Sequence, residues 1–379
     1  MHCQVLCNIE SGESEGCFTP VIFISMTFRT SIAAAGVLLI VACMQHGQPA
    51  SSSSSARSVA VQPQEKHFRS VSQITSDGEN AEAYFSHDGQ WLTLQSTREG
   101  RTCDQQYVMR IDGSNVRRIS DGRGKTTCGW FFPGDKRLFF ASTTAHDSAC
   151  PPRPDPSRGY VWALDRYDIY TVDRDGSDIK RLTSYDVYTA EGILSPDGKR
   201  IVFTSLKDGD LEIYTMNADG TDVRRLTNTP GYDGGAWWSP DGKQIVYRAN
   251  HPTDSAELKA YRDLLAQRLV RPSRVELFIM NADGSNQRQI TKLGGANFGP
   301  SWTPDGKRIV FSSNYKNPRS GNFDLYLVDA DGGNIEQLTF DEAFDGFPMF
   351  SPDGKKLVWA SNRNADKPGD TNLFIADWQ

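Results

Sequence analysis

The sequence lacks any excess of basic charge. Its 379 residues include 41 Lys and Arg against 47 Asp and Glu, which leaves a net charge of −6. A protein that binds nucleic acid through the phosphates needs a basic surface, so this balance argues against a nucleic-acid partner. Histidine is also scarce, with six residues in the whole chain. Because histidine is the commonest metal ligand, we expect neither a metal centre nor another cofactor.

Long apolar runs are missing except in one leader segment, residues 26–43, which reads MTFRTSIAAAGVLLIVAC. Arg29 supplies the positive start of an export signal, and the apolar stretch from Ile32 to Val41 is too short for a membrane-spanning helix. The final Ile-Val-Ala-Cys resembles a bacterial lipobox, in which Cys43 becomes the lipidated first residue of the mature chain. The alternative is a non-lipidated export signal that is cut somewhat later.

The leader divides the chain into four predicted segments: an over-extended start (1–25), a lipoprotein-type signal (26–43), a Ser-rich tether (44–67) and a folded domain (68–379). Met44, rather than an aspartate, follows Cys43, and this resembles sorting to the outer membrane of diderm bacteria. We therefore expect a monomer on the periplasmic side of the outer membrane that touches the membrane only through its lipid. Without lipidation the protein would be soluble in the periplasm.

A Ser-Pro-Asp-Gly turn followed by a β-rich run is repeated along the folded domain. Four clear copies read LSPDGKRIVFTS, WSPDGKQIVYRA, WTPDGKRIVFSS and FSPDGKKLVWAS, and two weaker copies read FSHDGQWLTLQS and FFPGDKRLFFAS. Successive copies lie 44 to 48 residues apart, except at two insertions, where the spacing is 63 and 64. The shorter spacing is typical of one four-stranded propeller blade, and Pro and Gly suit the turn itself.

Two further signals accompany each copy. The first is a hairpin such as IYTMNADGT, and the second is a short strand end such as RRLT. Only five strand ends follow the copies, and the sixth, VSQIT (Val71 to Thr75), precedes the first copy. This offset predicts that the N-terminal strand completes the last blade. The domain is therefore expected to be all-β, a six-bladed β-propeller with four-stranded blades and a closed ring.

The repeats SPDGKRIVF and IYTMNADGTDVRRLT are similar to the propeller repeats of the TolB family, the periplasmic component of the Tol–Pal system. The resemblance covers the WD40-like (PD40) propeller part, and it implies a periplasmic protein that binds partners. TolB carries an α/β domain before its propeller, whereas a lipobox and a tether occupy that place here. The resemblance is therefore to the propeller alone.

Both insertions fall between the second and third strands of a blade, the second and the fourth, so they should decorate the same face of the ring. The first insertion (146–168) contains four prolines within six residues, which makes it stiff. Its candidate contact residues are Arg153, Arg158, Tyr160 and Trp162. The alternative is that Tyr160 and Trp162 only pin the loop to its blade.

The second insertion (251–274) predicts a helix of about four turns on the propeller face. Asp254 and Glu257 resemble a capping box, and Pro272 would stop the helix. One apolar stripe contains Leu258, Tyr261, Leu265 and Leu269, and the outward basic residues are Lys259, Arg262 and Arg268. The helix would either roof part of the channel or act as a lid or partner helix.

Polar residues at one repeated position are expected to ring a mouth of the central channel. They are Asn80, Thr126, Thr189, Asp233, Asn297 and Asp345, with Glu82 and Glu191 nearby. Such a ring is either a solvated rim that satisfies its own backbone or a polar funnel that binds a peptide segment or a cationic group.

Three cysteines follow the tether, Cys103, Cys128 and Cys150. An exported chain permits a disulfide among them, with one thiol left free, but the spacing does not reveal the pairing. A zinc site that uses them with His146 is disfavoured, because paired Cys-x-x-Cys spacing is missing.

Two classes of function remain. The first is a non-catalytic module that binds an envelope protein or peptide through the insertion face. The second is a carbohydrate-active or peptide-processing enzyme, since related propellers serve as oligogalacturonate lyases or as gating domains of prolyl-oligopeptidase-like peptidases. The lyase needs a histidine-rich metal centre and the peptidase a hydrolase domain, whereas this sequence ends at Gln379. We therefore expect a binding protein and no enzyme.

Overall fold

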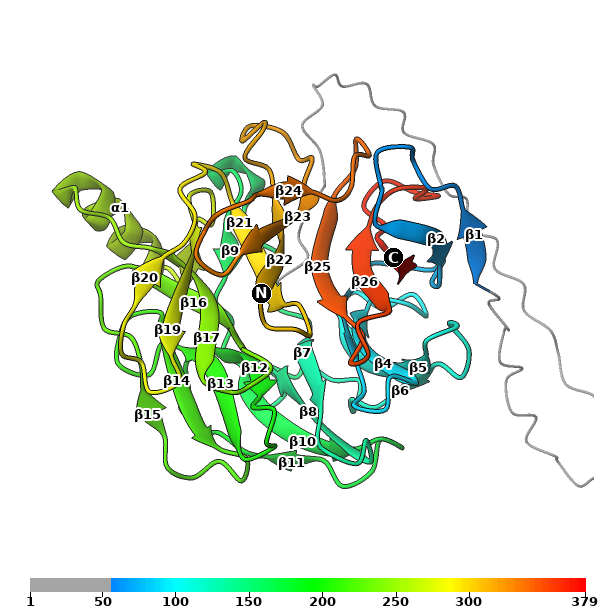
Figure 1. Ribbon diagram of the computed structural model, residues 1–379. Helices are drawn as coiled ribbons and strands as arrows, with labels where there is room; N and C mark the ends of the chain where they lie inside the picture. The colour runs from blue at the N-terminus through cyan, green and yellow to red at the C-terminus, as the bar shows by residue number, and fades with distance from the viewer. Residues whose placement is uncertain (1–55) are drawn as a thin grey trace, which may run out of the picture.

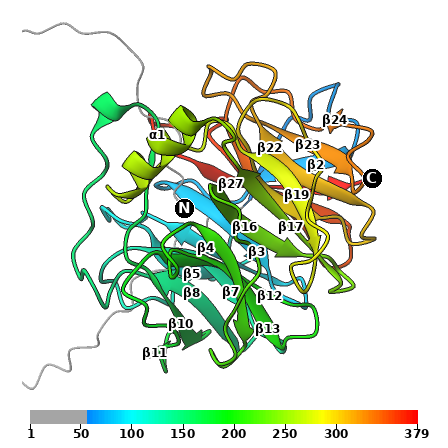
Figure 2. The same cartoon turned by 90° about the vertical axis from the view of Figure 1, so that its left-hand side faces the viewer.

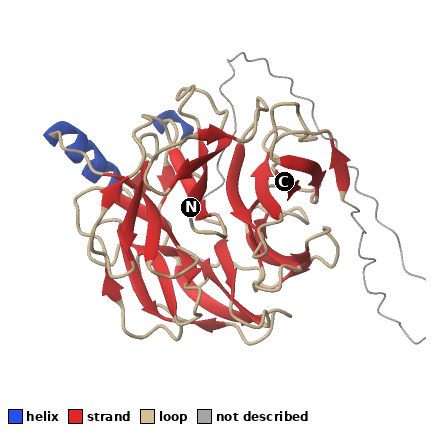
Figure 3. Ribbon diagram, viewed as in Figure 1, coloured by secondary structure: helices blue, strands red, loops and turns tan. Residues whose placement is uncertain are grey.

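The computed structural model describes residues 56–379, in which six antiparallel sheets surround a central channel (Figures 1 and 3). The predicted over-extended start, the signal segment, Cys43 and most of the tether lie outside the described residues. The first strand of each blade contacts the first strands of two neighbouring blades, and the sixth blade contacts the first. The prediction of a closed, six-bladed, all-β propeller is confirmed.

Each of the first three blades contains four strands that follow one another in the chain, except that the first insertion interrupts the second blade. They are β3 (Asn80–Phe85), β4 (Trp91–Ser96), β5 (Gln105–Arg110) and β6 (Arg117–Arg118); β7 (Thr126–Phe131), β8 (Arg137–Ser142), β10 (Asp168–Asp173) and β11 (Lys180–Arg181); and β12 (Thr189–Leu194), β13 (Arg200–Ser205), β14 (Glu212–Asn217) and β15 (Arg224–Arg225).

The last three blades follow the same order. They are β16 (Tyr232–Trp238), β17 (Gln244–Asn250), β19 (Glu276–Asn281) and β20 (Arg288–Gln289); β21 (Asn297–Trp302), β22 (Arg308–Ser313), β23 (Asp324–Asp329) and β24 (Glu336–Gln337); and β25 (Asp345–Phe350), β26 (Lys356–Ser361) and β27 (Asn372–Trp378), completed by β2 (Phe68–Gln73) and β1 (Arg57–Val59).

The N-terminal strand completes the last blade, as the count of strand ends predicts. Strand β2 pairs antiparallel with β27, with Val71 opposite Ala376. Strand β1 then pairs with β2, with Val59 opposite Val71, so the last sheet has five strands rather than four. Part of the segment assigned to the tether therefore belongs to the propeller, because residues 57–59 find an unpaired strand edge to bond to.

The Ser or Thr that ends each RLT-type segment has one structural role in all six blades. Its side-chain oxygen accepts a hydrogen bond from the N–H of the second residue of the third strand, at 2.8 to 3.1 Å. The pairs are Ser120–Gln106, Thr183–Ile169, Thr227–Ile213, Thr291–Leu277, Thr339–Leu325 and, across the closure, Thr75–Leu373. Thr75 thus makes in the last blade the bond that the other five make within theirs.

The Ser-Pro-Asp-Gly turn is a hairpin that also joins neighbouring blades. Ser195 Oγ donates to Asp197 Oδ1 at 2.6 Å and accepts from the N–H of Arg200 at 2.9 Å. Gly198 has φ +73° and lies against Pro133 of the preceding blade, where a Cβ atom would come within 2.7 Å of the proline ring. The turn therefore needs glycine both for its conformation and for the close approach.

The second copy has the inverted order Pro133-Gly134-Asp135, and its turn differs as expected. Asp135 adopts a left-handed φ of 56°. Its carboxylate accepts hydrogen bonds from the N–H groups of His87 at 2.9 Å and Asp88 at 3.0 Å, in the turn of the first blade. This contact joins the two turns with hydrogen bonds in place of the usual proline–glycine contact.

The apolar core lies between the blades. In β13, Ile201, Val202 and Phe203 are all fully buried, although they point to alternate faces of the sheet. Both faces are buried because each blade packs against a neighbour on either side. Within residues 56–379, no helix is both long and apolar enough to cross a membrane.

We expect loss of the closing strand to destabilise the whole ring. Deletion of residues 71–75 removes the pairing with β27 and uncovers the last blade, so the melting temperature should fall by roughly 10 °C or more. Deletion of residues 57–59, which removes only the additional edge strand β1, is the control and should lower it by less than about 3 °C. Circular dichroism melts of both deletions would show this, and equal melting temperatures would contradict the closure.

Candidate functional site

The two insertions join into one structure, although one comes from the second blade and the other from the fourth. The first (143–167) contains the short 3-10 helix η1 (Pro156–Arg158) and strand β9 (Trp162–Ala163). The second (251–275) contains α1 (Ser255–Leu265) and strand β18 (Leu269–Val270). Strands β9 and β18 pair antiparallel in a two-stranded ribbon, with Leu269 opposite Ala163 and Val270 opposite Trp162.

Helix α1 differs from its prediction in length and in position. It ends at Leu265, and Arg268 has a left-handed φ of 55°, which turns the chain into β18. Leu269 therefore lies in a strand, and the prediction of a four-turn helix is wrong. Figure 1 shows that α1 projects beyond the sheets, and Figure 2 shows it beside the first insertion on the side that faces the viewer; none of its residues is buried.

The N-terminal cap of α1 is only half of the predicted capping box. The Asp254 side chain accepts from the N–H groups of Ala256 and Glu257 at 2.8 and 3.0 Å. Glu257 does not complete the box, because its carboxylate accepts from Arg274 at 2.9 Å. On the side of the helix toward the propeller, Tyr261 donates to Asp210 of the third blade at 2.5 Å.

The ribbon, rather than the helix, covers the insertion end of the channel. Trp162 in β9 is only 3% exposed, and its ring meets that of Phe298 in the fifth blade, across the channel, at 6.3 Å between centroids. Its indole N–H donates to the hydroxyl of Tyr160 at 2.7 Å. Trp162 is therefore buried at this end of the channel, and the prediction that it contacts a partner is wrong. Tyr160, in contrast, remains 38% exposed.

The predicted arginines of the insertions fall into two groups. Arg153 pairs with Glu79 of the first blade at 2.8 Å, so it fastens the first insertion to the ring. Arg158 is exposed and donates to Gln267, just after α1, at 2.5 Å, which links the two insertions. Arg262 is exposed on α1.

A disulfide anchors the start of the first insertion. Cys103, between β4 and β5, is bonded to Cys150, and Cys128 stays free and buried. This assigns the pairing that the sequence left open. Within residues 56–379, no group of three or more His, Cys, Asp or Glu side chains is arranged so that it could hold a metal ion.

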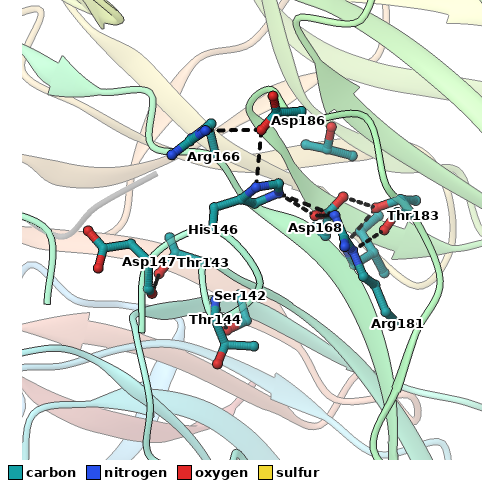
Figure 4. A network of polar contacts seen from close by, with 12 residues as sticks. Ser142, Thr143, Thr144, His146, Asp147, Arg166, Asp168, Arg181, Thr183 and Asp186 are labelled. Carbon is teal, nitrogen blue, oxygen red and sulfur yellow. Dashed lines mark hydrogen bonds and ion pairs between the residues drawn. The ribbon is translucent and has the colours of Figure 1, made fainter. Parts of the chain in front are cut away.

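His146 instead joins a polar network beside the first insertion (Figure 4). Its Nε2 lies 2.7 Å from the fully buried Asp168 carboxylate, and its Nδ1 lies 3.1 Å from Asp186. Asp168 also accepts from Arg181 at 2.6 Å and from Thr183 at 3.0 Å. These contacts hold the end of β8 to the third and fourth strands of its blade.

The residues predicted to ring the channel mouth are all fully buried: Asn80, Thr126, Thr189, Asp233, Asn297 and Asp345. Four of them, Asn80, Asp233, Asn297 and Asp345, were the candidates for a polar funnel that contacts a partner, and each bonds instead to its own blade. Asp233 accepts from His251 at 3.0 Å, Asp345 from Arg363 at 2.7 Å, Asn80 from Ser96 at 2.8 Å and Asn297 from Ser313 at 2.6 Å. They clamp the inner strand of each blade to the second strand and the loop after it, so a docking partner does not meet them.

The channel is lined by another repeated position, two residues further along each inner strand. A bulge interrupts the pairing there in all six blades, and the residue has φ between 49° and 60°. We call these six residues the channel ring: Glu82, Cys128, Glu191, Gly235, Gly299 and Phe347. All of them line one cavity of about 40 Å³ in the centre of the propeller.

The two glutamates of the channel ring differ in their charge partners. Arg248 from β17 donates to Glu191 and, at 2.7 Å, to the Tyr232 hydroxyl, while the N–H of Gly235 donates to Glu191 at 3.0 Å. Although burial opposes ionisation, the Arg248 guanidinium holds the pKa of Glu191 below its usual value. Burial raises the pKa of Glu82, which forms no ion pair within residues 56–379.

We expect removal of the disulfide to loosen the insertion platform. The bond closes a loop of sequence separation 47, so the double variant Cys103→Ser/Cys150→Ser should lose up to about 4 kcal/mol of unfolding free energy. Urea denaturation with and without reductant measures this. Cys128→Ser is the matched control and should keep the response to reductant, whereas an equally stable double variant would contradict the prediction.

Family models match two stretches of the chain. A model of the Tricorn protease N-terminal β-propeller domain matches residues 153–275, and a model of the TolB β-propeller domain matches residues 262–368. Dipeptidyl-peptidase 5 of Porphyromonas gingivalis is 51% identical over 39 residues, which are 10% of this chain and 6% of that protein. The chain thus spans a small fraction of the length of this relative.

Solved structures share the architecture of the chain. A putative TolB from Agrobacterium tumefaciens is 22% identical, with a TM-score of 0.56, and the match covers 80% of this chain and 91% of that one. TolB from Acinetobacter baumannii is 20% identical, with a TM-score of 0.50 and coverage of 80% and 65%. An oligogalacturonate lyase in complex with manganese is 16% identical, with a TM-score of 0.50 and coverage of 86% and 97%. These identities show the fold alone: the chain is a six-bladed β-propeller, and its residues 262–368 match the TolB β-propeller model.

Proposed function

We propose that this protein is a non-catalytic binding propeller of the cell envelope. It would be exported, anchored to the periplasmic side of the outer membrane by a lipid on Cys43, and would bind a protein or peptide partner through its insertion face. The TolB-like repeats support an interaction role. The exposed residues of the insertions include Tyr160 and six arginines, types that are enriched in recognition surfaces, and this favours binding over catalysis.

The observation that carries the proposal is the union of the two insertions. Segments about a hundred residues apart pair in the β9–β18 ribbon and are fixed by Arg158–Gln267 and the Cys103–Cys150 bond. Long loops with no partner normally remain separate and mobile, whereas these form one platform. A pre-organised surface binds with a smaller entropic penalty, so the platform is suited to recognition.

The charge of the platform indicates the chemistry of the partner. Residues 251–275 contain five basic and three acidic residues, in a chain with an acidic excess overall. Arg158, Arg262 and Arg268 are exposed and form no ion pair with a carboxylate of residues 56–379. The partner surface is therefore expected to be acidic, because complementary charge steers association and orients the complex.

Site-specific crosslinking tests which face binds. A photoreactive residue at position 158 or 262 should capture the envelope partner, while the same residue at position 199 or 307 should capture little. Lys199 and Lys307 are suitable controls, because their side chains are each 80% exposed in the Pro-Asp-Gly turns at the opposite face. Equal capture from both faces would refute binding through the insertion face.

Charge reversal gives a second readout of the same proposal. The double variant Arg158→Glu/Arg262→Glu should weaken partner binding roughly tenfold or more and reduce its dependence on salt. The matched double variant Lys199→Glu/Lys307→Glu changes the net charge equally at the opposite face. If both variants weaken binding to the same extent, net charge rather than the platform governs the interaction.

A further inference from the structure

The cavity inside the channel contains a buried carboxyl group with no ion-pair partner among residues 56–379. Glu82 is 3% exposed, and the Thr127 hydroxyl, 3.4 Å from its carboxyl group, donates to Gln95 at the shorter distance of 2.7 Å. The other cavity glutamate, Glu191, is neutralised by Arg248. An ionised carboxylate in an apolar interior requires a positive partner, and residues 56–379 supply none in contact with Glu82.

Aromatic rings form the wall of the cavity on the side of the hairpin turns. Tyr84, Trp130 and Trp237 come from three blades and meet with centroid distances of 5.0 to 5.5 Å. Tyr84 and Trp237 line the cavity together with Phe347 of the channel ring. Aromatic faces attract cations, and a carboxylate beside such faces is a suitable combination for an ammonium group.

Unsatisfied polar atoms are a separate sign that the channel holds an occupant. The hydroxyls of Tyr167 and Tyr188 and the side-chain nitrogen of Gln95 are buried and have no hydrogen-bond partner among residues 56–379. The rings of Tyr167 and Tyr188 meet at 5.9 Å and pack in the same cluster as Trp162, which covers the insertion end of the channel. Buried polar groups normally have a partner, and in this channel a polar ligand or water would supply it.

The size and accessibility of the cavity restrict what can enter. About 40 Å³ holds a few water molecules or the end of one narrow chain. At the insertion end, Trp162 and Tyr188 are 3% and 1% exposed and close the channel, whereas Trp237 and Met349 toward the hairpin turns are only partly buried. Entry is therefore from the hairpin side, opposite the face proposed to bind the partner.

We propose that the cavity binds a primary ammonium group carried on a narrow aliphatic stem. The ammonium group lies at Glu82, and the stem packs among Tyr84, Trp237 and Phe347. A free alkylamine and a lysine side chain of a peptide share this chemistry. The site uses other residues and the other end of the channel. A negative result for ammonium binding would therefore leave the proposed binding through the insertion face unaffected.

Tryptophan fluorescence of the purified full chain provides the test, because Trp237 lines the cavity and Trp130 packs against it. Two probes are titrated at constant ionic strength: n-butylammonium chloride, and a glycine–lysine–glycine peptide with blocked ends. Potassium chloride and n-butanol are the controls for charge alone and for the stem alone. We expect saturable binding of at least one ammonium probe and no saturable response to either control. The probe that binds identifies the source of the ammonium group.

Variants show whether the response comes from this cavity. Glu82→Gln keeps the shape and removes the charge, so it should weaken ammonium binding roughly tenfold or more. Glu212→Gln is the matched control, a buried glutamate in the third blade that pairs with Arg225 at 2.5 Å outside the cavity, and it should bind as the wild type does. Trp237→Leu should abolish the fluorescence response and weaken binding measured by calorimetry. It also serves as the test if Glu82→Gln fails to fold. Absence of saturable binding by either ammonium probe, or unchanged binding in Glu82→Gln or Trp237→Leu, overturns the proposal.

Discussion

The pairing between β2 and β27 is the constraint on which the rest of the molecule depends. Every blade buries both faces against neighbours, so the first and the last blade must meet for the apolar surfaces of either to be covered. Thr75 makes across this junction the same hydrogen bond that the other five blades make internally. The channel and the insertion platform exist only in the closed ring, because each is built from several blades.

Closure also explains why the repeated motif carries architecture rather than activity. In the Ser-Pro-Asp-Gly turn, the serine and aspartate hold the hairpin, and the glycine receives the proline of the preceding blade. Each residue of the turn thus makes a contact that stabilises the ring. Residues free to act on another molecule are found where the repeat is interrupted or where its inner strands bulge into the channel.

The sequence was sufficient to predict the ring because its evidence is periodic. The count of turns and strand ends specifies six blades and the closing segment from Val71 to Thr75. The β9–β18 ribbon could not be predicted, because two-residue strands have no periodicity and their pairing joins distant segments. The helix was predicted too long because Leu269 continues the apolar stripe, although the left-handed Arg268 ends any helix before it.

The channel residues were only partly predictable for a different reason. Glu82 and Glu191 were recognised as polar residues near the channel, but Asn80 and Asp233 were placed at its mouth on the same grounds and are buried clamps. A repeat shows that positions are equivalent. It does not show which of two neighbouring polar positions faces the axis. The bulge decides this, and four of its six residues are not glycine, so the usual signature of a left-handed conformation is missing.

That departure from glycine argues for a role of the channel ring beyond packing. Gly235 and Gly299 adopt the bulge conformation without the strain that a side chain adds there, which costs on the order of 1–3 kcal/mol per residue. The ion pair with Arg248 offsets the energetic cost of burying the Glu191 carboxylate. Glu82 bears the same strain and the same burial without an ion pair to any of residues 56–379. A glycine would satisfy the backbone at this position, so the carboxyl group is best explained by a cation that enters the cavity.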